Sequence, residues 1–478
     1  MILPDPRYRD LVLQEQLGSD DIDDLLAPIG FTDRQAAHRS LQRIAPQPEV
    51  RQALADCLPH LLAALSEAAN PDRVLINFER FGQSVDDAGA LFRYLADNPR
   101  AVEMLITLFA GSQFLSEILL RNPEYFERLM ERKGLAQPKS IDQFLAEARA
   151  AVSSCAEPDG RLDALRRFQR WELLRIGACD FFSLWDMPTA TAQLSHLADS
   201  LVRVCLDITA AELNATTDGF AVLALGKLGG EELNYSSDID LLFLAASDAT
   251  AYEQLGQRLI EALARVTAEG FLYRVDMRLR PWGRTGPLVS SLDGHILYLQ
   301  EHARLWEKQA LLKARVIAGD DVVGHEFLRQ AEPLLFDTTA EEVRRNVHEM
   351  KQRTEAHLRQ RGRKWGEVKL GEGSIRDIEF VTQYLQLIHG AQHPEVRQRK
   401  TLDALSRLAS GGFLPVADYR VLTDGYIFLR TVEHHLQLMH YRQTSTLPAD
   451  REELAHFARR LGFQGAEAGT QFLTRYQQ

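Results

Sequence analysis

Two aspartates stand at the start of an apolar segment near the middle of the 478-residue chain. Asp238 and Asp240 open the segment DIDLLFLA, which follows an earlier apolar run, Phe220–Leu225, and the glycine-rich turn Gly226–Gly230. Alternate side chains of a strand share one face, so the two carboxylates are expected to point the same way, roughly 6.5–7 Å apart. Two anions where burial begins need a cation or a proton to balance them. The pattern predicts a divalent-metal site for phosphoryl or nucleotidyl transfer.

A third carboxylate is expected on a neighbouring strand. Asp276 lies within the segment Tyr273–Leu279, between two apolar residues, where a solvated acid would be out of place. Mg²⁺ takes oxygen ligands, and two such ions can hold the attacking and leaving oxygens of an in-line displacement. We therefore predict that Asp238, Asp240 and Asp276 bind Mg²⁺, with two ions in the site. Acids that are merely solvated or cap a strand start are the alternative.

Glycines, hydroxyls and basic side chains around these acids suit a phosphate. A helix that begins at the glycine turn would present backbone N–H groups to an anion, and glycine allows the anion to approach closely. Arg278 and Arg280 would share a strand face with Asp276, where they could hold phosphate oxygens bidentately or form structural ion pairs. The predicted phosphate- or nucleotide-binding residues are Gly226, Lys227, Gly229, Ser236, Ser237, Arg278, Arg280 and Lys313.

A second motif, GSIRDIE, covers residues 373–379 at the start of an amphipathic segment. Arg376, Asp377 and Glu379 could form a second wall of the active-site cleft. Acids that complement the dipole at a helix N-terminus are the alternative. His434 and His435 are interpreted as half-buried helix residues rather than metal ligands.

Helices are expected to surround the strands that carry these candidate residues. Apolar residues recur at helical spacing from about residue 20 to 213 and again from about 340 onward, whereas strands are expected only between 220 and 318. The predicted fold class is mostly α with one α/β unit. The predicted division is an N-terminal helical region (1–188), a catalytic domain (189–330) and a C-terminal helical bundle (331–478).

Individual elements follow from the same patterns. The predicted strands are Phe220–Leu225, Asp238–Leu244 and Tyr273–Leu279, and the predicted helices include Val74–Tyr94 and Thr189–Leu213, the latter capped by Thr189 or Thr191. The helix Arg161–Asp180 carries five arginines beside its apolar stripe. These could form a solvated basic face or a surface that contacts phosphate or a partner near the acidic site. They are Arg161, Arg166, Arg167, Arg170 and Arg175.

Composition limits the class of protein. A net charge of −12 argues against nucleic acid as the main ligand. No apolar run approaches the ~20 residues that span a bilayer, and the N-terminus lacks a signal peptide pattern. Four scattered cysteines without a CxxC pair are expected to be buried thiols in a reducing compartment. We therefore expect a cytoplasmic protein without a membrane or nucleic-acid partner.

The motifs resemble a known family. A glycine turn, an Asp-x-Asp pair and a third strand carboxylate are the signature of the nucleotidyltransferase superfamily that includes DNA polymerase beta. More closely, the chain is similar to glutamine synthetase adenylyltransferase, also called glutamate-ammonia-ligase adenylyltransferase. The segments that carry this similarity are LRRFQRWELLRIGACD, LGKLGGEELNYSSDIDLLFL, YRVDMRLRPWGRTGPLVSSL, WEKQALLKARVIAGD and VKLGEGSIRDIEFVTQYLQLIHG.

The resemblance implies a polymerase-beta-like catalytic domain flanked by helices. Members of the family carry two such domains; one attaches AMP to a tyrosine of glutamine synthetase and the other removes it by phosphorolysis, giving ADP. This chain has one Asp-x-Asp constellation, and NYSSDID, VDMRLRPWGRTGPLV and GEGSIRDIEF look more like the N-terminal, adenylyl-removing half. Ser374 stands where a glycine is expected. The sequence ends within a helical pattern, as expected of a fragment of a longer polypeptide.

The function that the resemblance implies is Mg²⁺-dependent removal of AMP from glutamine synthetase. Its implied partners are glutamine synthetase, a PII-type signal protein, and phosphate with ADP or ATP. Two alternatives stay open: ATP-dependent adenylylation by the same fold, and a non-catalytic regulatory or docking half of a larger protein. A polynucleotide polymerase is disfavoured by the acidic balance of the chain and by the lack of basic-aromatic segments.

Overall fold

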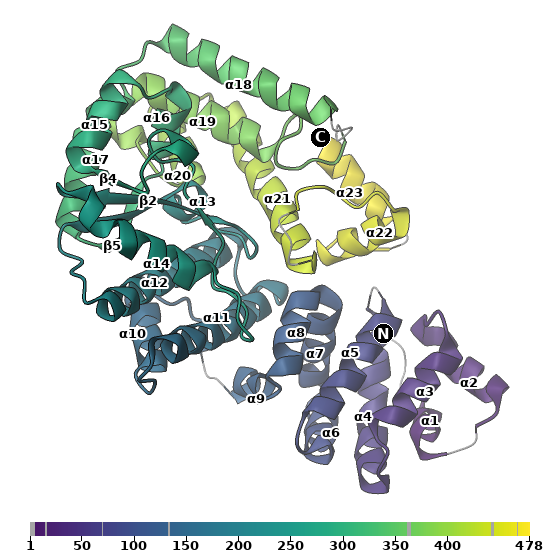
Figure 1. Ribbon diagram of the computed structural model, residues 1–478. Helices are drawn as coiled ribbons and strands as arrows, with labels where there is room; N and C mark the ends of the chain where they lie inside the picture. Colours follow the sequence, from purple (N-terminus) through teal and green to yellow (C-terminus); the bar gives the residue numbers. More distant parts are fainter. Residues whose placement is uncertain are drawn as a thin grey trace.

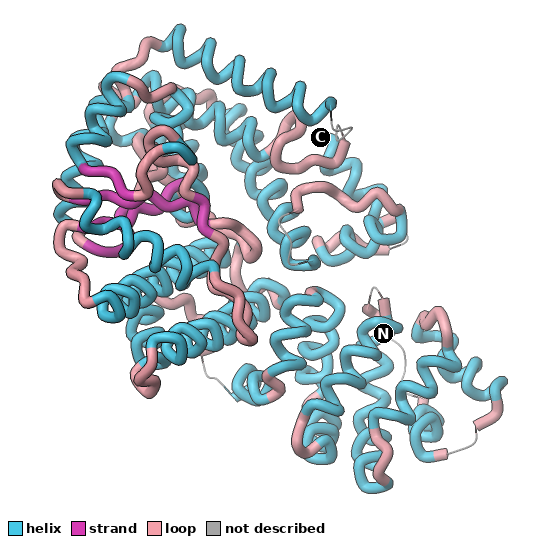
Figure 2. Tube along the Cα trace, in the orientation of Figure 1, coloured by secondary structure: helices cyan, strands magenta, loops and turns pink. Residues whose placement is uncertain are grey.

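The computed structural model describes residues 5–14, 17–68, 70–131, 134–360, 365–440, 444–465 and 467–478. Helices make up most of these residues, and the strands gather in one small sheet (Figures 1 and 2). The prediction of a mostly α fold with one α/β unit is confirmed. None of the described helices is both long enough and apolar enough to cross a membrane.

The N-terminal helices extend away from the sheet in Figure 1. One predicted helix, Val74–Tyr94, is instead two, because the Asp87 side chain accepts a hydrogen bond from Ala90 N and starts a new helix. Pro59 lies inside its helix without ending it. The elements are η1 (Pro6–Arg9), α1 (Asp10–Leu13), α2 (Ser19–Leu26), η2 (Ala27–Ile29), α3 (Arg34–Ile44), α4 (Pro48–Ser66), α5 (Pro71–Ser84), α6 (Ala88–Asp97), α7 (Pro99–Gly111), α8 (Gln113–Arg121), α9 (Glu124–Glu131) and α10 (Ile141–Val152).

Two long helices, α11 (Pro158–Phe181) and α12 (Met187–Leu213), connect this region to the sheet. The cap of α12 is Asp186, whose side chain accepts from Thr189 N, so the prediction of a threonine cap is wrong. The expectation of a solvated basic face on α11 is wrong for Arg166 and Arg175, which are 2% and 1% exposed.

Arg166 and Arg175 on α11 bond to protein groups rather than to solvent. Arg166 Nη2 donates to the carbonyls of Ala262 and Arg265, both at 3.2 Å, where the helix packed against α12 ends. Arg175 Nε donates to the buried Glu172 at 2.7 Å. Carbonyls in the last turn of a helix and buried acids need hydrogen-bond donors. Arg166 and Arg175 supply these donors inside the protein, so their side chains do not form a basic surface.

The sheet has the strand order β3-β2-β1-β5, with β4 also paired to β2. β1 is antiparallel to β2 and β5, whereas β3 and β4 run parallel to β2. The elements of this unit are β1 (Phe220–Leu225), α13 (Gly226–Gly229), β2 (Ile239–Ala245), η3 (Ala249–Tyr252), α14 (Glu253–Ala264), β3 (Val275–Asp276), η4 (Gly283–Thr285), β4 (Val289–Ser291), α15 (Leu292–Glu301), α16 (Leu305–Leu311), β5 (Arg315–Gly319) and α17 (Asp321–Leu335).

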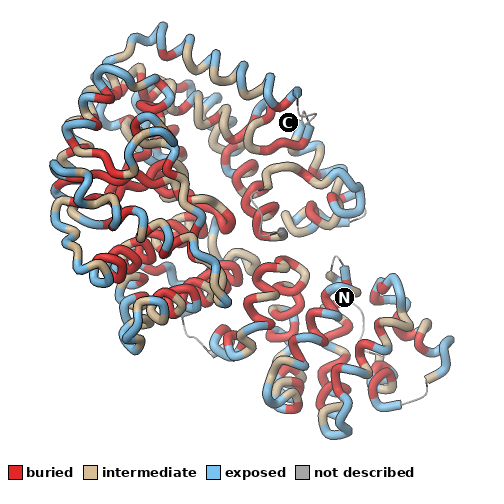
Figure 3. The backbone as a smooth tube through the Cα atoms, viewed as in Figure 1, coloured by how far each residue is buried: buried red, intermediate tan, exposed pale blue. Residues whose placement is uncertain are grey.

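Both faces of the sheet are covered, which explains why its central strands are continuous apolar runs. Phe220, Val222 and Phe243 belong to one large core with α12 and α14. Leu223 and Leu242 pack on the other face in a separate core with α15 and α17. β1 is buried along its whole length and β2 at every position except Asp240, as the red central strands in Figure 3 show. Helices on both sides therefore hold the head of β2, where the acids lie, in a fixed position.

The C-terminal helices curve back over the α/β unit (Figure 1). Long α21 contacts both α12 and α8, so this part of the chain reaches the sheet region and the N-terminal helices. The C-terminal helices have a separate apolar core, which includes Ile378, Tyr426 and Phe457. The elements are α18 (Ala340–Gln360), α19 (Ile375–His389), η5 (Pro394–Val396), α20 (Thr401–Ser410), α21 (Val416–His440), α22 (Arg451–Arg460) and α23 (Ala468–Gln477).

The four cysteines are free thiols. Cys57, Cys179 and Cys205 are buried, as expected, whereas Cys155 is partly exposed. Burial raises the pKa of Cys57 and Cys205 to about 12, so these two thiols are protonated and unreactive at neutral pH.

Candidate active site

The pairing of β2 with β3 brings two of the predicted acids side by side. Asp240 is the direct register partner of Asp276 in this parallel pair, and Asp238 immediately precedes β2. Burial, together with the Asp276 and Asp238 carboxylates, raises the pKa of Asp240 to about 6. Since each carboxylate opposes ionisation of its neighbour, the three form an anionic cluster that a cation would relieve.

Gly226 permits this placement of Asp240. The glycine has a φ of +53° at the end of β1, and a Cβ atom built on it would overlap Asp240 Oδ2. Leu225, the residue before it, is the register partner of Asp240 across β1 and β2. Both the left-handed backbone and the close approach require glycine at this position.

Two arginines hold the outer carboxylates. Arg274 Nε donates to Asp238 Oδ1 at 2.5 Å, and Arg274 Nη2 donates to the carbonyl of Ser236 at 2.7 Å. Arg278 donates to Asp276 Oδ2 through Nε at 2.8 Å and Nη2 at 2.5 Å. Although burial raises the pKa of Asp276, these bonds bring it below the usual range. Arg274 was not predicted; its only sequence signal is its place two residues before Asp276.

The acids fit a divalent cation in chemistry but are not arranged as ligands in this structure. Among the described residues, no group of three or more His, Cys, Asp or Glu side chains is placed to hold a metal ion. Asp238 and Asp276 are instead turned to Arg274 and Arg278. Hard carboxylate oxygens are the ligands that Mg²⁺ prefers, and the raised pKa of Asp240 indicates a charge that needs balancing. The roles of the three acids and the number of ions stay predictions.

The predicted strand Tyr273–Leu279 is much shorter, since β3 contains only Val275 and Asp276. The strand ends here because Asp276 Oδ1 accepts a hydrogen bond from Arg278 N at 2.8 Å, which turns the chain. Arg278 and Arg280 therefore lie outside the strand and do not share a strand face with Asp276, so that prediction is wrong. Arg280 Nη1 donates to the carbonyl of Met277 at 2.7 Å, so its guanidinium braces the loop.

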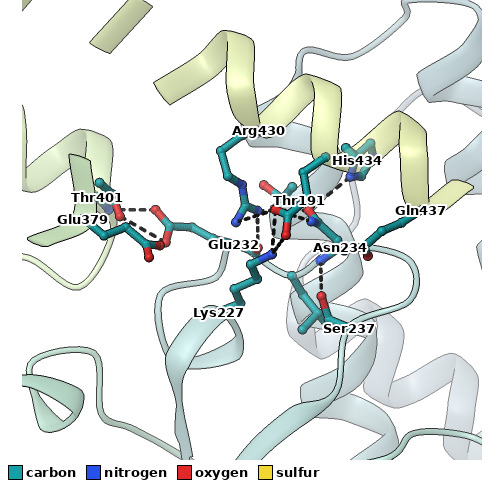
Figure 4. Close-up of polar contacts among 12 residues, drawn as sticks. Thr191, Lys227, Glu232, Asn234, Ser237, Glu379, Thr401, Arg430, His434 and Gln437 are labelled. Carbon is teal, nitrogen blue, oxygen red and sulfur yellow. Dashed lines mark hydrogen bonds and ion pairs between the residues drawn. The ribbon is translucent and has the colours of Figure 1, made fainter. Parts of the chain in front are cut away.

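Lys227 points toward α21 (Figure 4). Its Nζ donates to both carboxylate oxygens of the buried Glu433 at 2.7 Å. Burial opposes the ionisation of Glu433, but Lys227 and Arg430 outweigh it and lower the pKa of Glu433 to about 2. A phosphate that binds Lys227 would therefore have to compete with the Glu433 carboxylate, which already contacts the ammonium group.

The other predicted phosphate ligands near the turn are also engaged by protein. Ser236 N donates to Gln437 Oε1 at 3.3 Å, and Ser237 Oγ accepts from Asn234 N at 3.2 Å. A Cβ atom on Gly229 would collide with the carbonyl of Ala224, so this glycine is required for packing of the turn. Their contribution to phosphate binding stays a prediction.

Lys313 joins the α/β unit to the C-terminal helices. Its Nζ donates to Glu232 Oε2 at 2.6 Å and Thr401 Oγ1 at 3.1 Å, and lies 3.5 Å from Glu379 Oε1. Although burial alone would lower the pKa of Lys313, Glu232 and Glu379 raise it well above the usual range, so the side chain is a cation.

The three residues of the predicted cleft wall have different partners. Glu379 reaches the α/β unit through Lys313. Asp377 caps its own helix by accepting from Gly373 N at 2.8 Å and also pairs with Lys351, as the helix-dipole alternative anticipates. The Arg376 guanidinium lies 5.9 Å from the Phe380 ring centroid. Whether they form a cleft wall stays a prediction.

A buried polar cluster that sequence reasoning missed lies between the turn after α13 and α21 (Figure 4). Arg430, 0% exposed, donates to the carbonyl of Glu232 at 2.5 Å and to Asn234 Oδ1 at 3.0 Å. His434 is buried rather than half-buried, and its Nε2 lies 3.0 Å from Asp180 Oδ2. These partners are about two hundred residues apart in sequence, so no local pattern connects them.

A cavity of about 1040 Å³ opens elsewhere, between α9, α10 and α11. Tyr125, Phe168 and Trp171 are among its lining residues, and no predicted site residue lines it. The carboxylates at the head of β2, not this cavity, therefore define the candidate active site.

The acids on paired strands, the glycine turn beside them and the small mixed sheet are the features expected of the nucleotidyltransferase class of enzyme. Comparisons with known proteins narrow this class. Residues 102–330 match the family model described as glutamate-ammonia ligase adenylyltransferase. The resemblance found in the motifs is thereby confirmed. Residues 341–478 match a second model, described as GlnD PII-uridylyltransferase.

Three relatives carry the name bifunctional glutamine synthetase adenylyltransferase/adenylyl-removing enzyme. The Streptomyces avermitilis protein is 36% identical over 450 residues, covering 91% of this chain and 43% of the relative. The Pseudomonas aeruginosa protein is 36% identical over 408 residues (79% and 41%), and the Thioalkalivibrio sulfidiphilus protein 34% over 446 residues (87% and 44%). The chain thus spans less than half the length of the relatives it matches.

Proposed function

We propose that this chain removes AMP from an adenylylated tyrosine of glutamine synthetase by Mg²⁺-dependent phosphorolysis, releasing ADP. The observation that carries the proposal is the pairing of Asp240 with Asp276 beside Gly226, in a segment that matches the adenylyltransferase family. The names of the relatives support glutamine synthetase as the protein substrate. The similarity of NYSSDID and the segments after it to the adenylyl-removing half supports the direction.

In the proposed reaction an oxygen of inorganic phosphate attacks the AMP phosphorus. A P–O bond to phosphate forms as the P–O bond to tyrosine breaks, and the tyrosine oxygen takes up a proton. Asp238, Asp240 and Asp276 would hold Mg²⁺, which would neutralise charge on the phosphoryl oxygens. The chain's own contribution is to keep these acids fixed at the head of β2, so that charge stabilisation is pre-organised. Arg274 and Arg278, which pair with Asp238 and Asp276 in this structure, would have to give up these carboxylates to a bound metal.

The test supplies adenylylated glutamine synthetase, Mg²⁺ and phosphate, and measures ADP. Asp240→Asn is expected to lower the rate by at least about a hundredfold, because it removes a charge that acts on the transition state. Asp293→Asn, at an exposed position of α15, is the matched control and should retain the wild-type rate. Full activity of Asp240→Asn would contradict the proposal.

A second function, ATP-dependent adenylylation, is favoured by the description of the family matched by residues 102–330. Unmodified glutamine synthetase with ATP in place of phosphate distinguishes the two, since consumption of ATP with transfer of AMP would assign the opposite direction. If neither reaction occurs and Mg²⁺ does not bind, the chain is a non-catalytic regulatory half. The match of residues 341–478 supports the further proposal that a PII-type signal protein regulates the reaction.

A further inference from the structure

A loop leaves the sheet directly after Asp276 and returns to it at Val289. Residues 277–288 form this loop, and both of its ends are tied to β2, because Asp276 pairs with Asp240 and Val289 pairs with Phe243. Asp240 and Phe243 are three residues apart on one strand, so the two ends of the loop are separated by about 10 Å along it. The loop therefore stands beside the candidate active site.

The guanidinium of Arg280 holds this loop in one shape. Its Nη1 donates to the carbonyl of Met277 at 2.7 Å, and its Nε and Nη2 donate to the carbonyls of Gly286 and Arg284, both at 3.4 Å. Gly283 N donates in turn to the carbonyl of Arg280 at 2.9 Å. One side chain thus binds the loop near its start and near its end, so the surface that the loop presents is pre-organised for a partner.

Trp282 lies in the middle of the loop and is the most exposed of the five tryptophans, with 56% of its surface accessible. Its ring centroid lies 5.0 Å from that of Tyr298 and 5.0 Å from that of His302. Its φ is +62°, a left-handed conformation that a bulky residue adopts rarely and keeps only where its surroundings hold it. Tryptophan is enriched among the residues that dominate protein–protein binding, so a fixed and exposed indole suits a docking surface.

The loop is basic, although the chain as a whole is acidic. Residues 277–288 contain Arg278, Arg280 and Arg284 but neither Asp nor Glu, whereas the chain has a net charge of −12. The Arg278 side chain is 64% exposed even though it pairs with Asp276, and Arg284 is also exposed. Complementary charges steer association and fix the orientation of a complex. The partner of this surface is therefore expected to be acidic around an apolar contact for the indole.

The distance from the acids limits which partner the loop can meet. Trp282 is six residues after Asp276, and an extended chain of that length spans at most about 21 Å. A protein–protein contact of standard size covers about 800 Å² of each partner, a patch about 30 Å across, so one contact can include both Trp282 and the acids. A protein that brings a modified tyrosine to the acids must place its surface close to them, and therefore close to this loop.

We infer that the loop 277–288 is the docking surface for the protein that presents the adenylylated tyrosine. Trp282 makes an apolar contact with that protein, and Arg284 lies opposite its acidic side chains. This inference rests on the proposed function and deepens it, because it names the surface that receives glutamine synthetase.

The test measures the binding of adenylylated glutamine synthetase to the immobilised chain, with Mg²⁺ and without phosphate, so that no turnover occurs. Trp282→Ala is expected to raise the Kd at least about tenfold, because a central aromatic contact is lost. Trp282→Phe keeps an aromatic ring and should restore part of the affinity. The control is Ile76→Ala, at a position that is 52% exposed on α5, and it should bind as the wild type does.

Salt tests the charge complementarity separately. Raising the salt concentration should weaken binding to the wild-type chain, since exposed charges are screened. Arg284→Glu is expected to raise the Kd at least about threefold at low salt and to reduce its dependence on salt. Arg345→Glu, at an exposed position of α18, changes the net charge equally and should leave the salt dependence as it is.

Binding of AMP distinguishes a lost docking contact from a damaged site. In calorimetric titration with Mg²⁺, Trp282→Ala should bind AMP as tightly as the wild type, because AMP has no protein surface. A wild-type Kd for adenylylated glutamine synthetase in Trp282→Ala, or weaker binding of AMP alone, would overturn the inference. If the wild-type chain binds adenylylated glutamine synthetase but makes no ADP, the proposed function fails, and the comparison of Kd values still decides the role of the loop.

Discussion

At the scale of single residues, the contact between Gly226 and Asp240 gives the sharpest prediction. Gly226→Ala would place a methyl group against the Asp240 carboxylate in a backbone conformation with a φ of +53°. The left-handed backbone costs about 1–2 kcal/mol, and the displaced carboxylate would lower the reaction rate about a hundredfold. The rate of ADP formation from adenylylated glutamine synthetase measures the effect on activity, and urea denaturation measures the effect on stability.

The control for this prediction is Gly412→Ala. Gly412 has a φ of +78° and no atom within 4 Å of an added Cβ, so the variant has the backbone strain without the overlap. It should lose a similar free energy of unfolding and keep its activity. Equal rates for the two alanine variants would mean that the approach of Gly226 to Asp240 does not position the acid.

A second prediction for a single residue concerns the dependence of stability on pH. His295 on α15 is 3% exposed, its ring lies 4.8 Å from that of Phe327, and burial lowers its pKa to about 3. The unfolded chain takes up this proton near pH 6.5, whereas the native chain does not, so stability is full above that pH and falls below it. At pH 5.5 the loss is about 1.4 kcal/mol.

His295→Leu should therefore reduce the loss of stability between pH 7.5 and 5.5 by about this amount. Chemical denaturation of both proteins at the two pH values measures the difference, in which the contributions of the other histidines cancel. An identical loss in the two proteins would mean that His295 is protonated in the native state.

At the scale of elements, the contact of α21 with the turn after α13 holds the site together. Glu433 is 1% exposed and binds Lys227 at 2.7 Å and Asn234 Nδ2 at 2.9 Å. Glu433→Ala leaves these donors and Arg430 without their acceptor, so it should lower the free energy of unfolding by about 3–5 kcal/mol. Lys227→Met should also destabilise the protein, because it leaves a buried carboxylate.

A double-mutant cycle measured by urea denaturation tests this contact. The variant Lys227→Met/Glu433→Ala should be about 1–3 kcal/mol more stable than the sum of the single effects predicts, since the remaining partner no longer carries an unpaired charge. Additive effects would show that the ion pair between the two elements is not formed in solution.

The strands illustrate what the sequence can predict. β1 has the predicted bounds, and β2 begins and ends one residue later than expected, because long apolar runs are local signals. β3 was predicted too long, since the turn depends on a hydrogen bond from Arg278 N to the Asp276 side chain. The pattern predicted Asp276 on a strand next to that of Asp240, whereas their pairing in register is a finding of the structure.

The partners of the site could not be predicted in the same way. Lys227 is 206 residues from Glu433, and Glu232 is 169 residues from Thr401. A sequence shows that these residues are charged or polar but not that tertiary packing brings them together. For this reason the sequence predicts Lys227 and Lys313 as phosphate ligands, whereas in the structure they pair with Glu433 and Glu232.

At the scale of the whole molecule, the cores do not coincide simply with stretches of sequence. One apolar core runs from Tyr8 through the first face of the sheet and includes Leu438 of α21. The C-terminal helices and the second sheet face have cores of their own. The division at 188 and 330 stays a prediction; α12, which begins at Met187, packs on α11, α14 and β5.

The contact between the two ends of the chain leads to the last prediction. Arg460 in α22 donates to the carbonyls of Ala110 and Gly111 at the end of α7, and Ser112 Oγ donates to the carbonyl of Leu438 at 2.6 Å. Burial lowers the pKa of Arg460 to about 10, but it stays cationic at neutral pH and complements the C-terminal dipole of α7. This contact closes the N-terminal helices against the C-terminal ones.

Arg460→Ala should lower the free energy of unfolding by about 1–3 kcal/mol, because it leaves helix-end carbonyls without a donor. Hydrogen exchange should increase at α8 and α22, while AMP release changes little, since the acids at the head of β2 are not part of this contact. Arg459→Ala, at the exposed neighbouring position, should stay within about 0.5 kcal/mol of wild type. Equal exchange in the two variants would mean that the chain in solution does not close at this contact.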